Sequence, residues 1–145
     1  MKNYQRSAIV PYSAKEMYEL VADIPAYGDF LPWCGGARVD ERYDDHLIAT
    51  IDIDFRGIHK SFTTQNRFVE NEWMDMRLMN GPFSHLHGTW MFSSLNERGS
   101  KIELDIEFDF SSRILRTLVG PIFDYISNGM VDAFHRRAEQ RYGGR

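Results

Sequence analysis

The run from Ile102 to Phe110 constrains the fold more than any other part of the chain. Large apolar residues occupy every second position, and acidic residues lie between them. Successive side chains of an extended strand point to opposite faces. The run therefore predicts a strand with one apolar face and one wet face, which requires a sheet around it and a cover over the apolar side.

The same period of two continues upstream, from about residue 36, and is interrupted by turn residues. Folding the chain back at each turn predicts a curved antiparallel sheet of six to seven strands with one wide apolar face. The predicted neighbours are Trp90 with Ile106, Phe92 with Leu104, Ile53 with Phe62, Thr64 with Leu78 and, as an ion pair on the opposite face, Arg67 with Asp75.

Two polar residues, Thr64 and Asn66, fall near the middle of the predicted apolar face. Buried hydroxyl and amide groups need hydrogen-bond partners. Either the neighbouring chain or water satisfies them, or they face a ligand. In the second case a hydrogen-bond donor in an apolar pocket would orient a carbonyl-bearing molecule.

The C-terminal run predicts the cover, a helix from about residue 112 to 142. Its apolar residues recur at steps of three and four, and Pro121 is expected to kink or divide the helix. One straight helix about 45 Å long cannot fill the concave side of a curved sheet, so we expect an apolar cavity between them. The predicted stripe consists of Leu115, Leu118, Val119, Ile122, Phe123, Ile126, Met130, Ala133 and Phe134.

The segment Asp23–Cys34 is unusually apolar for a connector. It follows a short helix that a capping box of Ser13 and Glu16 predicts. Prolines and a glycine exclude a long regular element here. Leaving four large side chains in water would cost about 1.5–3 kcal/mol each. The segment is therefore interpreted as a lid over the cavity, with Tyr27, Phe30, Leu31 and Trp33 as its apolar residues.

Composition limits the remaining possibilities. The chain has 145 residues, enough for a single domain over 1–145, with 43% hydrophobic residues and one cysteine, Cys34. It shows no signal peptide or membrane-spanning run, so a cytoplasmic location is expected. A net charge of −4 argues against generic nucleic-acid binding, and DNA is not an expected partner. Arginines nevertheless gather at the C-terminus, as a solvated helix end or as a docking patch: Arg136, Arg137, Arg141 and Arg145.

Groups able to do chemistry are sparse in the sequence. His85 and His87 share one side of a strand, but no third metal ligand with suitable spacing joins them. Cys34 lacks a partner base, and Asp52 and Asp54 should point away from the cavity. No catalytic residue and no metal site is predicted.

Five runs of the chain resemble a known family. These are VPYSAKEMYELVADIPAY, DFLPWC, KSFTTQN, GPFSHLHGTWMF and IELDIEFDF. They are similar to the START-like (Bet v 1-like, helix-grip) proteins of the polyketide cyclase superfamily. Within it they most resemble the coenzyme Q-binding proteins, whose bacterial relatives include ribosome-association toxins. The resemblance implies an α+β fold in which the sheet wraps on the C-terminal helix around an internal apolar cavity.

The resemblance also implies two functions. The first, and the leading hypothesis, is a non-enzymatic carrier or chaperone of a polyprenyl quinone such as ubiquinone, supporting respiration. The second is a toxin that binds the large ribosomal subunit and blocks subunit joining. A third hypothesis, a cyclase-like enzyme on an apolar substrate, would require an acid–base residue that points into the cavity, and the sequence shows no such machinery.

For the first function the expected ligand-binding residues are Tyr27, Phe30, Leu31, Trp33, Thr64, Asn66, Trp90, Phe92, Ile106, Phe108, Ile122, Phe123 and Ile126. For the second, Arg136, Arg137 and Arg141 are the expected docking residues. A carrier would collect its cargo from a bilayer, so transient contact with the inner face of the membrane is expected through the lid and the basic patch.

Overall fold

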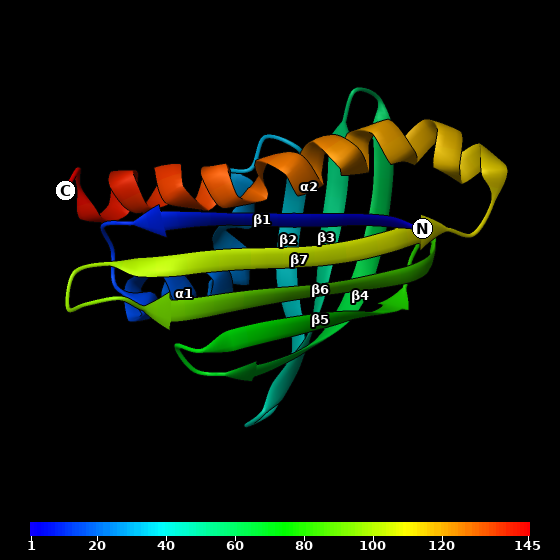
Figure 1. The fold of residues 1–145 in the computed structure, drawn as a ribbon. Helices are drawn as coiled ribbons and strands as arrows, with labels where there is room; N and C mark the ends of the chain where they lie inside the picture. The colour runs from blue at the N-terminus through cyan, green and yellow to red at the C-terminus, as the bar shows by residue number, and fades with distance from the viewer.

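Hairpins join six consecutive strands into an antiparallel meander, as the computed structural model of all 145 residues shows (Figure 1). The N-terminal strand β1 adds to the free edge of β7, which gives the order β1-β7-β6-β5-β4-β3-β2. The predicted α+β architecture with a curved antiparallel sheet is confirmed, with seven strands. Their bounds are β1 Lys2–Val10, β2 Cys34–Arg42, β3 His46–Phe55, β4 Ile58–Val69, β5 Trp73–Asn80, β6 Phe83–Ser94 and β7 Ser100–Phe110.

The β3–β4 hairpin corrects part of the predicted register. Arg56 and Gly57 both have positive φ, 51° and 81°, as in a two-residue turn whose twist matches the flanking strands. Phe62 therefore lies opposite Ile51, and the predicted partner Ile53 is wrong by two residues. A shift of two residues keeps every side chain on the same face, so the apolar face itself is unaffected.

The β6–β7 hairpin differs from the prediction in the same way. Its loop spans residues 95–99, because Ser94 pairs with Ser100. Trp90 consequently lies opposite Leu104, whereas Ile106 lies opposite Gly88. The predicted pairs of Trp90 with Ile106 and of Phe92 with Leu104 are therefore wrong, although all these residues share the concave face.

Strand β4 pairs with β5 as predicted, and Thr64 lies opposite Leu78. Arg67 also lies opposite Asp75, but the expected ion pair between them does not form. The carboxylate of Asp75 instead contacts Nε of Arg77 at 3.2 Å and Nε2 of His87 at 2.7 Å. The predicted register between β4 and β5 is therefore correct, although the ion pair that was expected to support it is absent.

Helix α1 (Ala14–Ala22) begins at the predicted capping box. The Ser13 hydroxyl accepts from the Glu16 backbone N–H at 3.1 Å, and the Glu16 carboxylate accepts from the Ser13 N–H at 3.0 Å. A six-residue 3₁₀ helix, η1 (Ile24–Asp29), follows at once with Pro25 in its first turn. Helix α1 packs against β6, β7 and the chain's last helix, and η1 packs against β2.

That last helix, α2 (Arg113–Tyr142), is continuous over thirty residues. Pro121 lies within it without dividing it, and Figure 1 shows the axis changing direction in the first third of the helix. Val119, Ile122 and Phe123 are buried against the sheet, whereas Leu118 is 50% exposed. Leu118 was therefore wrongly placed in the covering stripe.

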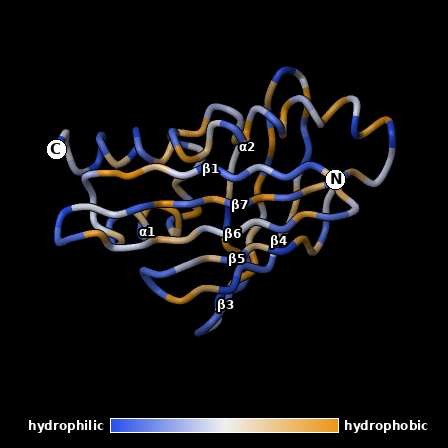
Figure 2. The backbone as a smooth tube through the Cα atoms, in the orientation of Figure 1, coloured by the Kyte–Doolittle hydropathy of each residue, from blue (hydrophilic) through white to orange (hydrophobic).

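The core fills the space between the concave face of the sheet and the helices. Its 32 buried hydrophobic residues form one connected cluster. Figure 2 shows the alternation of hydrophobic and hydrophilic residues along the strands that produces this face.

Candidate ligand cavity

An apolar cavity of about 50 Å³ lies between the concave face and α2. A space of this size holds a few water molecules at most. Side chains from five strands, from α2 and from the lid segment surround it. Its walls are Tyr27, Trp33, Ile51, Phe62, Thr64, Met76, Leu86, Gly88, Trp90, Ile106, Phe123, Ile126 and Met130.

Gly88 creates much of the free space. A Cβ atom at this position would lie 2.9 Å from Cε of Met76 and 3.6 Å from Cγ1 of Ile106. A larger residue would therefore project into the cavity. Because Met76 and Met130 are unbranched and adaptable, two walls can change shape without a change in the backbone.

Thr64 is the polar group on the strand walls of the cavity. It is 4% exposed, and its hydroxyl donates to Oδ1 of Asn66 at 2.7 Å. The Asn66 amide in turn contacts Sδ of Met74 at 3.8 Å. The two polar residues therefore satisfy each other, and the lone pairs of the Thr64 oxygen remain available to accept a hydrogen bond from the cavity.

The lid segment is turned inward. The Tyr27 hydroxyl donates to the backbone carbonyl of Val21, and burial raises the pKa of this hydroxyl. Tyr27 and Phe30 both contact the ring of Phe134 edge to face, with centroid distances of 5.5 and 5.1 Å. Trp33 is only 4% exposed. The lid therefore closes the cavity and offers little apolar surface for the predicted contact with a membrane.

Seven of the thirteen predicted ligand-binding residues line this cavity: Tyr27, Trp33, Thr64, Trp90, Ile106, Phe123 and Ile126. The other six are Phe30, Leu31, Asn66, Phe92, Phe108 and Ile122, which pack around it. Phe92 stacks against Trp90 and meets Tyr18 of α1 edge to face at 5.6 Å. Phe108, in the strand next to β1, meets Phe123 edge to face with a ring-centroid distance of 4.6 Å. Curvature of the sheet directs these side chains to other layers of the core.

Six wall residues were missed by the sequence analysis: Ile51, Phe62, Met76, Leu86, Gly88 and Met130. Five belong to the apolar patterns and could have been found by following the inner face of each strand and helix. Gly88 carries no hydropathy signal. Only the observed register, which places it opposite Ile106, reveals its role.

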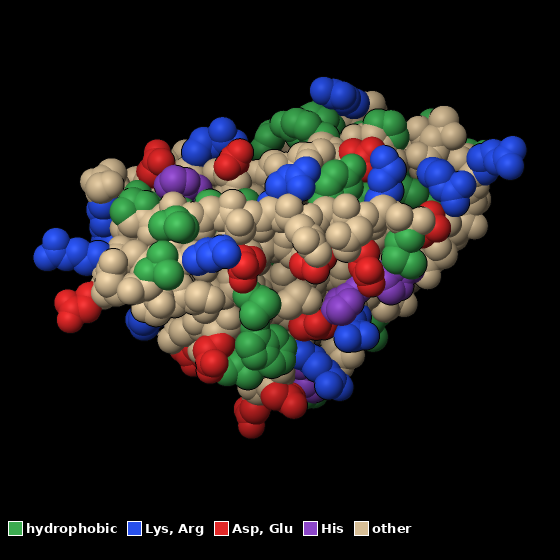
Figure 3. Space-filling view, viewed as in Figure 1, with side chains coloured by type: hydrophobic (Ala, Val, Ile, Leu, Met, Phe, Trp, Pro, Cys, Tyr) green, Lys and Arg blue, Asp and Glu red, His purple; other side chains and the backbone are tan.

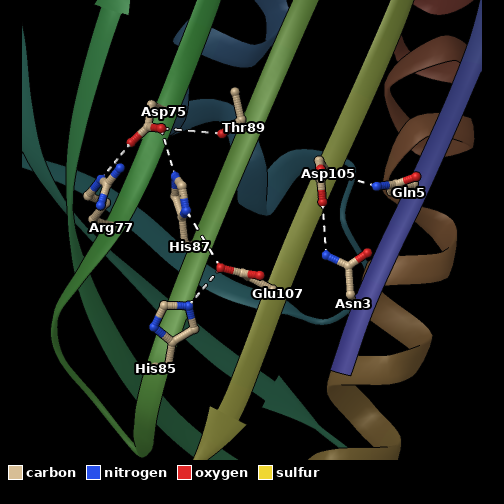
Figure 4. Close-up of polar contacts among 9 residues, drawn as sticks. All are labelled: Asn3, Gln5, Asp75, Arg77, His85, His87, Thr89, Asp105 and Glu107. Carbon is tan, nitrogen blue, oxygen red and sulfur yellow. Dashed lines mark hydrogen bonds and ion pairs between the residues drawn. The ribbon is translucent and has the colours of Figure 1, made fainter. Parts of the chain in front are cut away.

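Polar contacts cover the opposite, convex face of the sheet (Figure 4). Nε2 of His85 lies 3.0 Å from Oε1 of Glu107, and Nδ1 of His87 lies 3.8 Å from the same oxygen. These side chains extend across β5, β6 and β7 on the solvent side, as expected for both histidines. No group of three or more His, Cys, Asp or Glu residues has a geometry that could hold a metal ion.

Asp75 is the carboxylate most embedded in this polar surface. Its burial raises the pKa, but the hydrogen bond from His87 and the charges of His87 and Arg77 outweigh burial and lower it. A carboxyl group with a lowered folded-state pKa stabilises the fold above its unfolded pKa, and this contribution is lost as the pH falls through the folded value.

We expect Asp75→Asn to lower the free energy of unfolding by about 1 kcal/mol at neutral pH, because the charged acceptor is lost. The difference from wild type should vanish well below the ordinary carboxyl pKa of 3.8, where Asp75 itself is protonated. Urea unfolding, followed by circular dichroism from neutral pH to well below 3.8, measures the difference in unfolding free energy between the variant and wild type. Glu97→Gln, in the exposed β6–β7 loop, is the control; a pH-independent difference for Asp75→Asn would contradict this explanation.

The remaining chemical groups lie away from the cavity. Sγ of Cys34 contacts the carbonyl oxygen of Gly36 at 3.3 Å, and burial raises the pKa of the thiol. This favours the neutral thiol over the nucleophilic thiolate. Asp52 accepts from Ser61, and Asp54 lies 3.3 Å from His59, both on the outer face as expected.

The C-terminal arginines have different environments. Arg145 pairs with both carboxylate oxygens of Glu16, at 2.8 and 3.0 Å. The guanidinium of Arg137 lies 4.9 Å from the ring centroid of Phe30 and so holds the lid. Arg136 and Arg141 are exposed and form no ion pair. These two are the arginines at the end of α2 that neither form an ion pair nor stack on a ring.

A long helix gripped by a curved antiparallel sheet around an apolar cavity defines a class of lipid- and polyketide-binding proteins. The family model for "Polyketide cyclase / dehydrase and lipid transport" matches residues 10–135, and the chain belongs to this family. The resemblance drawn from the sequence is thereby confirmed. None of the helices combines the length and the hydrophobicity that spanning a bilayer requires.

Curated relatives match along the whole chain. The ribosome association toxin RatA of Vibrio cholerae is 43% identical over 143 residues, covering 99% of each chain. RatA of Escherichia coli K12 is 38% identical over 145 residues, covering all of this chain and 92% of the relative. The mitochondrial coenzyme Q-binding protein COQ10 homolog B of Xenopus laevis is 28% identical and is covered over 59% of its length.

Solved structures agree with the fold. The Zhui aromatase/cyclase from Streptomyces sp. R1128 superposes with a TM-score of 0.85 over 97% of this chain and 95% of its own, at 16% identity. The 18 kDa protein CC1736 from Caulobacter crescentus is 28% identical, with a TM-score of 0.77 over 99% of this chain and all of its own. The similarity to the cyclase concerns the fold alone.

Proposed function

We propose that this protein binds an apolar ligand of the polyprenyl quinone class between the sheet and α2, as a carrier rather than an enzyme. The observation that carries the proposal is the largely apolar cavity, whose wall residues with polar groups are Thr64, Tyr27, Trp33 and Trp90. Such a site suits a ring with few polar groups followed by a hydrocarbon tail. The family description and the relative named as a coenzyme Q-binding protein support it.

Binding requires the cavity to widen. Its volume of about 50 Å³ is well below the roughly 300–1,000 Å³ of typical ligand pockets. The methionines of the wall can rearrange. The lid contacts α2 through Tyr27 and Phe30, which meet Phe134, and through Phe30, which lies under Arg137. Displacement of η1 from Phe134 would extend the cavity toward solvent and give the ligand a path of entry.

The polar groups of the cavity favour binding over catalysis. Tyr27 is committed to the carbonyl of Val21, and Thr64 to Asn66. No carboxylate, imidazole or lysine lines the walls, so the cavity offers no general acid or base. The Thr64 oxygen can accept a hydrogen bond, which suits the hydroxyl of a reduced quinone better than the carbonyl of an oxidised one.

Organic extraction of protein purified from a quinone-producing host tests the proposal. Mass spectrometry of the extract should detect a polyprenyl quinone or quinol in a stoichiometric amount. Loading of purified protein with ubiquinone, followed through quenching of Trp90 and Trp33 fluorescence, provides a second measurement. A protein that is empty on purification and shows no quenching with the oxidised or the reduced ligand would contradict the proposal.

Filling the cavity should abolish this binding. Gly88→Leu places a side chain where a Cβ already approaches Met76 and Ile106, so we expect at least a tenfold loss of quinone affinity, about 1.4 kcal/mol. Gly129→Leu is the matched control, because a Cβ at Gly129 in α2 meets nothing within 4 Å. Thermal unfolding of both variants verifies the fold; equal affinities in the two folded variants would exclude this cavity as the site.

A second candidate function is association with the large ribosomal subunit. Full-length relatives at 38–43% identity carry the name of ribosome association toxins. Arg136 and Arg141 supply free positive charge for ribosomal RNA on the exposed side of α2, whereas Arg137 and Arg145 are engaged within the protein. This surface is separate from the cavity, so the two functions can be tested separately.

Overexpression should deplete joined ribosomes in a sucrose gradient if this second function holds. We expect Arg136→Glu, Arg141→Glu to restore them, because two attractive contacts with phosphates become repulsive. Arg42→Glu, Arg98→Glu, which reverses two exposed cations elsewhere, is the control for the change in net charge. A gradient that does not respond to overexpression excludes the function, and equal depletion by the double variant excludes this surface.

A further inference from the structure

Helix α2 has a second apolar stripe, which faces solvent. Ile114 is 72% exposed, Leu118 50% and Tyr125 47%, and Pro121 is also exposed. These residues follow one another at steps of four, three and four and therefore lie on one side of the helix. The buried residues of the same segment, such as Ile122 and Ile126, face the sheet about a third of a turn away.

The β3–β4 hairpin extends this stripe sideways. The ring of Phe55 stacks on Tyr125 with a centroid distance of 5.3 Å. The guanidinium of Arg56 lies over both rings, 4.9 Å from Phe55 and 6.0 Å from Tyr125. Figure 1 shows the hairpin rising beside the N-terminal half of α2. We call the surface formed by Phe55, Ile114, Leu118, Pro121 and Tyr125 the outer stripe.

Free cations surround the outer stripe. Arg56, Lys60 and Arg113 are exposed and form no ion pair. Two carboxylates in this region are paired with cations, Asp109 with Arg116 and Asp124 with Lys2, and Asp54 contacts the ring of His59. Hydrophobic and basic side chains gather along this edge in the space-filling view (Figure 3). The edge is thus locally positive, although the whole chain carries −4.

We propose that the outer stripe docks this protein on an anionic lipid bilayer. Apolar side chains along one side of a helix, flanked by arginine and lysine, match the boundary between acyl chains and negatively charged headgroups. Long basic side chains can remain in the headgroup layer while the stripe enters the apolar layer. The proposal does not depend on which ligand the cavity holds, and it places the contact away from the inward-turned lid.

Vesicle flotation tests the proposal with the whole protein. Wild type should float with vesicles of phosphatidylcholine mixed with phosphatidylglycerol, and should remain at the bottom with phosphatidylcholine alone. We expect Ile114→Asp, Leu118→Asp to weaken binding about tenfold or more. Arg56→Glu, Arg113→Glu should weaken it to a similar extent, because each free cation contributes about fivefold. Added salt should release the wild-type protein.

Matched controls separate the surface from general effects of charge. Met91→Asp, Leu95→Asp replaces exposed apolar residues on β6 and its loop, and Arg42→Glu, Arg98→Glu reverses two cations elsewhere. All these positions are exposed, so circular dichroism should show folded variants. Controls that bind like wild type support the proposal. Failure of wild type to float, or flotation of the outer-stripe variant equal to wild type, overturns it.

The flotation experiment can fail independently of the quinone-binding and ribosome-binding proposals. Loss of quinone binding in Gly88→Leu leaves the outer stripe intact, so that variant should still float. A protein that binds ribosomal subunits through Arg56 and Arg113 but ignores anionic vesicles would show that the partner is ribosomal RNA, and would overturn the bilayer proposal.

Discussion

Phe134→Ala should lower the free energy of unfolding by about 3–5 kcal/mol, the largest effect we expect from a single substitution in α2. Phe134 is fully buried, and its ring meets Tyr27, Phe30 and Trp90 edge to face at 5.5, 5.1 and 5.3 Å. Removal of the ring leaves a cavity and ends three aromatic contacts at once. Urea unfolding measures the loss.

The same substitution should loosen the lid more than the rest of the molecule. Phe134 of α2 contacts Tyr27 of η1 and Trp90 of β6, so its loss removes one of the contacts that hold η1 over the cavity. Amide hydrogen exchange in residues 24–33 should accelerate relative to that in β7. Leu118→Ala in the exposed part of the same helix is the control, with an expected change within about 0.5 kcal/mol. A loss of under about 1 kcal/mol for Phe134→Ala would contradict this role.

Gly81→Ala should cost about 2–4 kcal/mol, the second largest effect. Gly81 has a φ of +153°, and a Cβ there would lie 2.7 Å from Cβ and 3.2 Å from Cα of Phe62. The substitution therefore combines an unfavourable backbone conformation with overlap against a neighbouring strand. Because Phe62 is a wall of the cavity, its displacement should also reduce ligand binding.

Gly57→Ala separates the cost of the backbone conformation from the cost of overlap with Phe62. Gly57 also has a positive φ, of 81°, but a Cβ there meets nothing within 4 Å. This variant should lose only about 1 kcal/mol from backbone strain. Chemical denaturation of the pair provides the comparison. Equal losses would show that overlap with Phe62 has no effect at Gly81.

Local patterns in the sequence were sufficient to predict the elements of the fold. The alternation in Ile102–Phe110 predicted β7 and its buried face, and the capping box predicted the start of α1. The register between β4 and β5 also followed from the sequence. These features depend on side-chain periodicity and on short-range hydrogen bonds, both of which can be read from neighbouring residues.

The remaining differences arise from turns and from curvature. A non-glycine residue, Arg56, adopts a positive φ in the β3–β4 turn, which residue type does not reveal. The resulting shift of two residues changes the partners of Phe62, and a similar shift in β6–β7 brings Gly88 opposite Ile106. A shift of two residues keeps each side chain on its face, so the apolar character of the cavity was predictable. It changes which residues lie opposite each other, so the wall residues were predictable only in part.

The helical part of the outer stripe could not be predicted from the sequence, for a related reason. Leu118 follows the same steps of three and four as its buried neighbours, and helical spacing alone assigned it to the covering face. Two apolar stripes on one helix overlap in a one-dimensional pattern. The packing of the sheet against Val119 and Phe123 distinguishes them.

The position of β1 at the edge of β7 sets an order for folding during synthesis. Val10 pairs with Ser100, and Lys2 pairs with Phe108, so β1 must wait for most of the chain. At about 5–20 residues per second, this delay is on the order of 5–20 s. The earlier hairpins of the meander can form one by one in that time, before β7 is made. The N-terminal strand is thus made first and placed last, and its arrival pairs the edge of β7, one of the two edges at which the newly made meander could pair with another chain.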